Sequence, residues 1–184
     1  AFSHDVVEVH DMSTGLLDDR GHLMAQTWLG ATGHTGCMPA FGANLVEAFP
    51  PKTVKPGDVF ICNDPWLCNG QTADIFITTP AFHKGKLIGF SVNTIHHVDI
   101  GGRKGSGLSE EVFEEGLIIP MLRLYDAGKP NEMLFDLIRR NVRYSEKMIG
   151  DLRAQVATGW AGCRELERLC AEFDFPDLRE VSDE

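Results

Sequence analysis

The chain has 184 residues and a formal net charge of −10 at pH 7, and 43% of its residues are hydrophobic. This length allows one sizeable core, arranged in one domain or two. The acidic balance argues against nucleic-acid binding, which needs clustered positive charge to neutralise phosphates. No stretch approaches the roughly 18 uninterrupted apolar residues of a membrane span, and no charged start followed by an apolar core indicates a signal peptide.

Five cysteines are spread along the chain, and no two of them form a C-x-x-C pair. An odd set of this kind favours reduced thiols over a disulfide framework, so we expect a cytoplasmic protein. The sequence opens with Ala1 in the middle of an alternating pattern. We therefore expect a segment of a larger subunit, with part of the site in the missing flanks.

The first elements are predicted to be a hairpin and a helix. Two short strands around an Asp/Gly-rich turn at 18–21 predict a β-hairpin over residues 12–28. Residues 30–36 are rich in small side chains and are expected to form a loop that presents His34. Apolar residues at helical spacing predict a helix over 39–49, with a proline in its first turn and a proline pair after it.

The middle of the chain is predicted to form a sheet. A short apolar strand at 58–62 leads into a loop over 63–73. Two longer strands follow, at 75–82 and 87–95, and a Lys-Gly turn joins them. These strands are expected to pair as a hairpin.

The last third of the chain changes to a helical period. After a further predicted strand at 117–124, apolar spacing indicates one helix around 134–138 and a long amphipathic helix over 145–173. The predicted fold class is therefore α+β or mixed α/β. β-Hairpins and a sheet occupy the first two thirds, to about residue 125, and helices occupy residues 131–173.

The most informative seven residues run from His96 to Gly102. Two imidazoles and a carboxylate, His96, His97 and Asp99, follow the apolar strand at 87–95 and precede a glycine pair. Histidine is the commonest metal ligand and titrates near neutral pH, so this pattern favours a functional site at the strand end. The alternative is a pair of strand-end histidines that are hydrogen-bonded to the backbone.

The predicted hairpin gives His96 a partner. The turn lies about ten residues from Asp74 and from His96, so the two are expected to face each other across neighbouring strands. A carboxylate beside an imidazole suits Mn²⁺, Zn²⁺ or Fe²⁺, with a third ligand from a loop. The alternative is a hydrogen bond between Asp74 and His96 that only braces the hairpin end.

Two loop residues have weaker signals. Asp64, in Asn63-Asp64-Pro65-Trp66, is a candidate third ligand or general base, although Asn-Asp-Pro is equally a turn-forming sequence. His34 is more typical of a solvated or capping residue. The chain has no G-x-x-x-x-G-K-[ST] loop, no G-x-G-x-x-G motif behind a strand and no G-x-S-x-G motif. Any ATP is therefore expected to bind another subunit or domain.

Short motifs run through most of the chain. In chain order they are Leu16-Leu17-Asp18 with Gly21; His34-x-Gly36-Cys37-Met38-Pro39; Pro56-Gly57-Asp58-Val59; Asn63-Asp64-Pro65-Trp66; Asp74-Ile75; His96-His97-x-Asp99-x-Gly101-Gly102; Glu115-Gly116-Leu117-x-Ile119-Pro120; Asn141-x-Arg143; and Gly150-Asp151-Leu152-x-Ala154-Gln155. With these motifs in this order, the chain resembles the hydantoinase B/oxoprolinase family. That family includes the B-type components of ATP-dependent hydantoinases and lactamases, the C-terminal part of 5-oxoprolinase, and the large subunits of acetone- and acetophenone-type carboxylases.

The resemblance implies that residues 1–184 are a partial hydantoinase B-like domain in a hetero-oligomer. A hydantoinase A-type partner would activate the substrate with ATP, and the B-type component would complete the reaction. In carboxylase members the resemblance suggests a divalent metal held by a His-x-x-Asp pair and a later histidine. Asp74 and His96 match the second and third of these ligands, whereas Gln71 stands at the first. The resemblance therefore leaves metal binding weakened, altered in geometry, or rescued by His97, Asp64 or His34.

Three functions follow as hypotheses. The first is a hydrolase subunit that opens a cyclic amide of the hydantoin, lactam or 5-oxoproline type. In it Asp74 and His96 hold a metal or orient water, and Asp64, His97 or Asp99 acts as a catalytic group. The second is an ATP-dependent ketone carboxylase subunit that uses the same pocket. The third is a non-catalytic segment that binds a partner.

Overall fold

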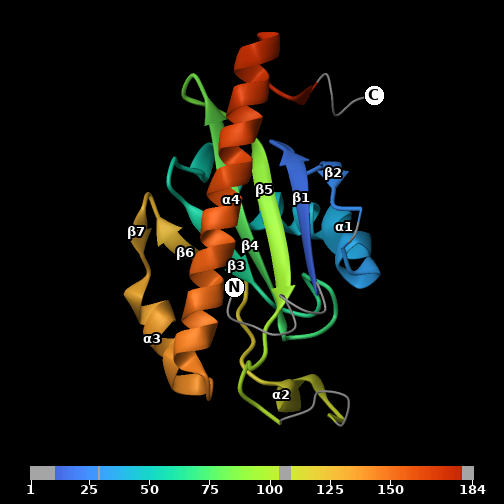
Figure 1. The fold of residues 1–184 in the computed structure, drawn as a ribbon, viewed down its shortest axis with the longest axis vertical. Coiled ribbons are helices and arrows are strands. Elements are labelled where there is room, and N and C mark those ends of the chain that lie inside the picture. Colours follow the sequence, from blue (N-terminus) through green and yellow to red (C-terminus); the bar gives the residue numbers. More distant parts are fainter. Residues whose placement is uncertain (1–10, 29, 104–108, 180–184) are drawn as a thin grey trace.

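A seven-stranded antiparallel sheet with the order β2-β1-β5-β4-β3-β6-β7 forms the centre of the fold. The structure is a computed structural model that describes residues 11–28, 30–103 and 109–179. The long helix α4 crosses one face of the sheet, and α1 lies against the opposite face (Figure 1). The predicted α+β class, with a sheet followed by a helical C-terminal part, is confirmed.

The bounds of the elements are as follows. The strands are β1 Met12–Asp18, β2 Leu23–Gln26, β3 Val59–Cys62, β4 Asp74–His83, β5 Lys86–His96, β6 Leu122–Asp126 and β7 Lys129–Pro130. The helices are α1 Thr32–Ala48, α2 Val112–Glu115, α3 Glu132–Asn141 and α4 Ser145–Phe173, with a 3₁₀ turn, η2, at Pro51–Thr53.

The hairpin of β4 and β5 is buried along nearly its whole length. Side chains alternate between its two faces. Phe76 packs on Phe41 of α1, with ring centroids 4.6 Å apart, whereas Ile75 and Ile77 belong to the cluster under α4. Because helices cover both faces, these strands show continuous apolar runs in the sequence. The register confirms the predicted hairpin, with Asp74 opposite His96.

Helix α1 begins earlier than the sequence suggests. The prediction of a loop over 30–36 and a helix from residue 39 is wrong, because α1 already begins at Thr32. Its first turns contain two glycines, which are weak helix formers and favoured the loop assignment. However, His34, Met38 and Phe41 form a buried stripe along the helix. Packing of this stripe on the sheet thus outweighs the local propensity.

The predicted strand at 117–124 is also displaced, since β6 runs from Leu122 to Asp126. In the earlier part of the predicted strand, the backbone of Ile119 forms hydrogen bonds with Asn63. Its side-chain oxygen accepts from the Ile119 N–H at 2.5 Å, and its own N–H donates to the Ile119 carbonyl at 3.0 Å. Pro120 has no N–H to contribute to a ladder. Regular pairing with β3 therefore begins only after this segment.

The C-terminal helices follow the predicted spacing closely. The Asn131 side chain caps α3 by accepting from the Leu134 N–H. Helix α4 spans the predicted residues and lies close to the sheet, because Gly159 and Gly162 face Thr79 and Ser91 with no side chain between them. Among the helices of the described residues, none has the length and apolar character that a membrane crossing requires.

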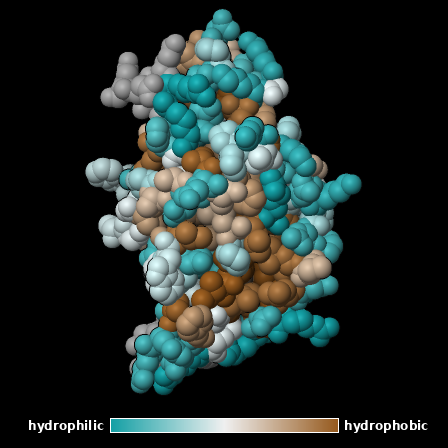
Figure 2. Space-filling view, turned by 180° about the vertical axis from the view of Figure 1, so that it is seen from behind, coloured by the Kyte–Doolittle hydropathy of each residue, from teal (hydrophilic) through white to brown (hydrophobic). Residues whose placement is uncertain are grey.

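The face opposite α4 carries exposed apolar side chains. Figure 2 shows them gathered in the lower half of that face, with polar residues around them. Across the described part of the molecule, the exposed large hydrophobic side chains include Trp28, Trp66 and Phe113. A contiguous exposed apolar patch of this kind is typical of a surface that contacts another polypeptide.

Helix α1 docks on the β1–β2 turn through two glycines, which gives a first prediction. A Cβ atom added to Gly42 would lie 2.1 Å from the backbone oxygen of Gly21. Alanine normally stabilises a helix interior by about 1 kcal/mol relative to glycine. We expect the clash to reverse this, so that Gly42→Ala lowers the free energy of unfolding by about 1–3 kcal/mol in urea denaturation.

Gly36 of the same helix is the matched control, because a Cβ there meets nothing within 4 Å. We expect Gly36→Ala to raise the free energy of unfolding by up to about 1 kcal/mol. Equal stabilisation of both variants would contradict the close approach of α1 to the turn.

Candidate active site at the edge of the β4–β5 hairpin

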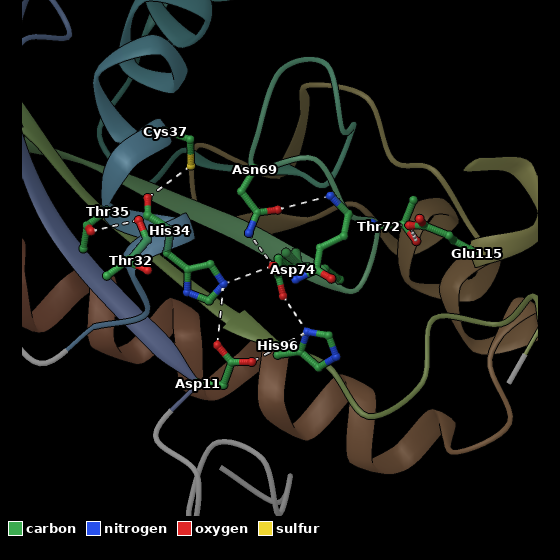
Figure 3. Close-up of polar contacts among 12 residues, drawn as sticks. Asp11, Thr32, His34, Thr35, Cys37, Asn69, Thr72, Asp74, His96 and Glu115 are labelled. Atoms are coloured by element: carbon green, nitrogen blue, oxygen red, sulfur yellow. Dashed lines mark hydrogen bonds and ion pairs between the residues drawn. The ribbon is translucent and has the colours of Figure 1, made fainter. Parts of the chain in front are cut away.

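Two imidazoles meet the Asp74 carboxylate on the face of the sheet that α1 covers. Asp74 begins β4, His96 ends β5, and His34 comes from the first turn of α1. His96 Nδ1 lies 2.7 Å from Asp74 Oδ1, and His34 Nε2 lies 3.0 Å from Asp74 Oδ2 (Figure 3). The expected contact between Asp74 and His96 is therefore present.

Two side-chain amides from the preceding loop complete the surroundings of Asp74. Gln71 Nε2 donates to Asp74 Oδ2 at 2.5 Å, and Asn69 Nδ2 donates to the same oxygen. The Asp74 side chain is fully buried. Burial alone would raise the pKa of this carboxyl, but hydrogen bonds from His34, His96 and Asn69 outweigh it and hold the pKa well below its ordinary range. Asp74 is thus an ionised, solvent-free carboxylate.

Asp11 lies on the other side of the two imidazoles, just before β1. Its carboxylate oxygens lie 3.7 Å from His34 Nε2 and 3.9 Å from His96 Nδ1. Its side chain is 31% exposed, so this side of the cluster is open to solvent. Figure 3 shows both histidine rings between the two carboxylates.

Sequence reasoning omitted Asp11 and gave His34 a solvated or capping role. The pairing of β1 with β5 places Met12 beside Ile95, and hence Asp11 beside His96. That pairing joins strands that lie far apart in the sequence, so no local pattern indicates it. For His34, the available signal is its position four residues before Met38 and seven before Phe41, which puts it on the buried stripe of α1.

The side chains around Asp74 do not fit a metal ion as they are arranged. Two imidazoles with carboxylates are suitable ligand types. Within the ranges that the structure describes, however, no group of three or more His, Cys, Asp and Glu side chains is placed to hold a metal. The amide hydrogens of Asn69 and Gln71 point at the Asp74 oxygen that a cation would need. The metal at Asp74 and His96 stays a prediction.

His97 points to the opposite face of the sheet from His96, because successive strand residues alternate. Its Nε2 lies 3.0 Å from Gln155 Oε1 of α4, and the amide nitrogen of Gln155 donates to the Ile75 carbonyl. His97 is 2% exposed, and this burial lowers its pKa to about 4. The ring is therefore neutral at pH 7 and is held by α4.

Asp99 connects the loop after β5 to the start of α4. It accepts hydrogen bonds from the backbone N–H groups of Gly101, Arg143 and Tyr144, and from Arg143 Nη1 at 2.8 Å. Desolvation would raise the pKa of Asp99, but these backbone and side-chain donors lower it overall. Asp99 thus links two segments through hydrogen bonds, and its catalytic role stays a prediction.

Asp64 forms the turn that its sequence also allowed. Its Oδ1 accepts from the Trp66 N–H at 3.0 Å, and its carbonyl accepts from the N–H groups of Leu67 and Cys68. The structure shows no contact of Asp64 with Asp74 or His96. A role for Asp64 as a ligand or base stays a prediction.

A cavity of about 340 Å³ lies beside the cluster. Its wall includes His96, His97 and Asp99, and Arg103, Glu115 and Arg143 contribute further polar groups. Three of the five predicted site residues therefore share one cavity. Asp74 lies behind this wall, bonded to Ala73 and in contact with His96, and neither Asp74 nor Asp64 lines the cavity.

The burial of His97 predicts a pH dependence of stability. The folded pKa, about 4, lies below the ordinary value of 6.5, so between these values the unfolded chain binds a proton that the folded chain does not. Stability from this group is complete above about pH 7 and is lost as the pH falls toward 4. The loss amounts to about 3 kcal/mol at most.

Replacement of His97 isolates its contribution to the pH dependence of stability. We expect His97→Gln to flatten the decline in the free energy of unfolding between about pH 7 and pH 4.5, measured by urea denaturation. The control is His22→Gln. The His22 side chain is 61% exposed, so water screens its 3.3 Å ion pair with Asp18 and the profile should stay close to that of the wild type. An unchanged profile in His97→Gln would contradict the assignment of a buried neutral ring.

Comparison with known sequences places the chain among a set of related proteins. A sequence model described as hydantoinase B/oxoprolinase matches residues 1–184. The chain is 33% identical to an uncharacterized protein of Methanocaldococcus jannaschii and 27% identical to the putative B component of a D-/L-hydantoinase of Pseudomonas sp. NS671. It is 30% identical to the beta chain of the caprolactamase of Pseudomonas jessenii. These matches cover 98%, 100% and 92% of this chain, but only 33%, 32% and 29% of the relatives.

Solved structures show the same fold. A nucleotide-free acetone carboxylase structure has a TM-score of 0.84 at 24% identity, over 99% of this chain and 24% of that one. The ATP-dependent caprolactamase of Pseudomonas jessenii has a TM-score of 0.80 at 28% identity, over 95% of this chain and 30% of that one. The chain thus spans about a third or less of the proteins it matches, and over its full length it belongs to the hydantoinase B/oxoprolinase family.

Proposed function

We propose that this chain is part of a subunit that completes the ATP-dependent opening of a cyclic amide ring. The substrate is a hydantoin, a lactam or a 5-oxoproline, and a hydantoinase A-type partner carries the ATP. The relatives named above that have a stated activity include a putative hydantoinase component and a caprolactamase component, and hydantoin and caprolactam are both cyclic amides. The five cysteines are all unpaired thiols, which suits a cytoplasmic location.

The observation that carries this proposal is the contact between His96 and Asp74 at the wall of the cavity. The cavity, at about 340 Å³, lies in the size range of small-molecule sites. His96 Nδ1 bonds to the buried carboxylate, and its Nε2 lies on the far side of the ring, away from Asp74 (Figure 3). An imidazole oriented by a carboxylate is the arrangement that general bases use to activate water.

The proposed reaction needs one general base at the wall of the cavity. Once the partner has activated the amide, water adds to the ring carbonyl carbon and gives its proton to His96 Nε2. The ring C–N bond then breaks, and the same proton goes to the leaving nitrogen. The phosphoryl group that activated the carbonyl oxygen leaves as inorganic phosphate when a second water hydrolyses the acyl phosphate that remains. Asp74 stabilises the imidazolium that forms between the two steps.

Other predicted bases are less well placed in this geometry. His97 Nε2 contacts Gln155, and both Asp99 oxygens accept hydrogen bonds from the segment before α4. We therefore propose His96 as the base and regard His97 and Asp99 as part of the cavity wall. The carboxylase alternative has the fold likeness alone in its favour, because the acetone carboxylase match has 24% identity.

The proposal predicts a large loss of turnover without His96. The full-length subunit, purified with its partner, is assayed for ring-opened product and ATP consumption on hydantoin, caprolactam and 5-oxoproline. We expect His96→Gln to lower the rate on the active substrate by about 10²-fold or more, with a smaller change in KM.

His22→Gln is the control and should turn over at nearly the wild-type rate, since that side chain is exposed and lies on the β1–β2 turn. Wild-type turnover by His96→Gln would remove His96 from the mechanism. A wild-type complex that consumes no ATP with any cyclic amide would overturn the proposed function.

A further inference from the structure

We propose that Asn69 and Gln71 replace a metal ion at Asp74, so that the site works as a metal-free pair in which Asp74 orients His96 as the base. This deepens the proposed function and rests on it only for the role of His96. The statement that no metal binds at Asp74 stands on the hydrogen bonds around that carboxylate.

One oxygen of the Asp74 carboxylate, Oδ2, already has its full set of donors. An ionised carboxylate only accepts hydrogen bonds and offers about four lone-pair positions. Oδ1 accepts from His96, and Oδ2 accepts from His34, Asn69 and Gln71. Three donors already exceed the two lone-pair positions of the buried Oδ2, so a cation at this oxygen would have to displace the two amides.

The hydrogen bond to Asp74 also fixes the proton on His96 Nδ1. Because the ionised Asp74 cannot donate, the hydrogen bond of 2.7 Å between them requires the proton to be on Nδ1. A metal ion binds the lone pair of a ring nitrogen, so it would have to remove this proton. Metal ligation by Nδ1 and the hydrogen bond to Asp74 are therefore mutually exclusive.

The loop before β4 holds the side-chain amides of Asn69 and Gln71 in place. Gly70 has a φ of +93°, which allows the tight bend between Asn69 and Gln71, and the Gln71 N–H donates to Asn69 Oδ1 at 3.4 Å. Directly after Gln71, the N–H and hydroxyl of Thr72 both donate to Glu115 Oε2, at 2.9 and 3.1 Å. With both ends held, the two amides are directed at Asp74, as Figure 3 shows for Asn69.

The resulting site differs chemically from one built on a metal. Amide donors neutralise part of the Asp74 charge without taking the lone pair of an imidazole. His96 gives one nitrogen to Asp74, and its ring is part of the cavity wall. The base is then an oriented histidine, whereas a metal site would use a metal-bound water.

The experiment measures metal content and needs no substrate. The full-length subunit with its partner is dialysed against EDTA, freed of chelator and titrated with Mn²⁺ and Zn²⁺ in equilibrium dialysis. We expect far less than one ion per subunit in the wild type. We expect Gln71→His, which replaces an amide donor by an imidazole ligand, to bind Mn²⁺ or Zn²⁺ about tenfold more tightly or better.

Gln26→His is the matched control, because it adds the same side chain on the exposed end of β2. It should bind no more metal than the wild type. An equal gain in both variants would show that the added histidine acts nonspecifically and would count against the proposal.

One result overturns the inference outright: a wild-type complex that retains about one ion per subunit, lost in Asp74→Asn. The metal content of the wild type tests the inference even if Gln71→His fails to fold. It also separates the two proposals. A metal-loaded complex that opens cyclic amides would refute only the inference, and a metal-free complex that acts on no cyclic amide would refute only the proposed function.

Discussion

The burial of one ionised carboxylate, Asp74, constrains much of this structure. Removing such a charge from water costs several kcal/mol unless hydrogen bonds replace its solvation. Here the donors come from β5, from α1 and from the loop before β4. Each of these segments must therefore dock correctly for the charge to be tolerated. The register of β4 and β5, the early start of α1 and the bend of the loop are parts of one arrangement.

The alternation of side chains along β5 then separates two histidines that look equivalent in the sequence. His96 lies on the α1 face with Asp74, and His97 lies on the α4 face with Gln155. The same elementary period explains why one ring is oriented by a buried charge and the other is kept neutral by burial. Asp99 adds a third constraint, since it ties the loop after β5 to the segment that begins α4.

The sequence predicts the contacts that arise within one hairpin or one helix, and it misses those that need distant segments to dock. The contact of Asp74 with His96 follows from the spacing around one turn, and α4 follows from a long apolar period. In contrast, His34 joins the site only because α1 packs on the sheet, and Asp11 only because β1 pairs with β5. Two glycines made the start of α1 look like a loop, although its buried stripe determines the outcome.

Position 71 decides which chemistry this frame supports. With an imidazole at position 71, a cation could bind the side chains of the cluster and would take the lone pair of His96 Nδ1. With Gln71, a neutral amide donates to Asp74 instead, and His96 keeps the proton that bonds it to the carboxylate. That carboxylate fixes the ring so that Nε2 is the nitrogen without a proton. We propose that this single side chain distinguishes a proton-transfer site from a Lewis-acid site built on the same neighbouring residues.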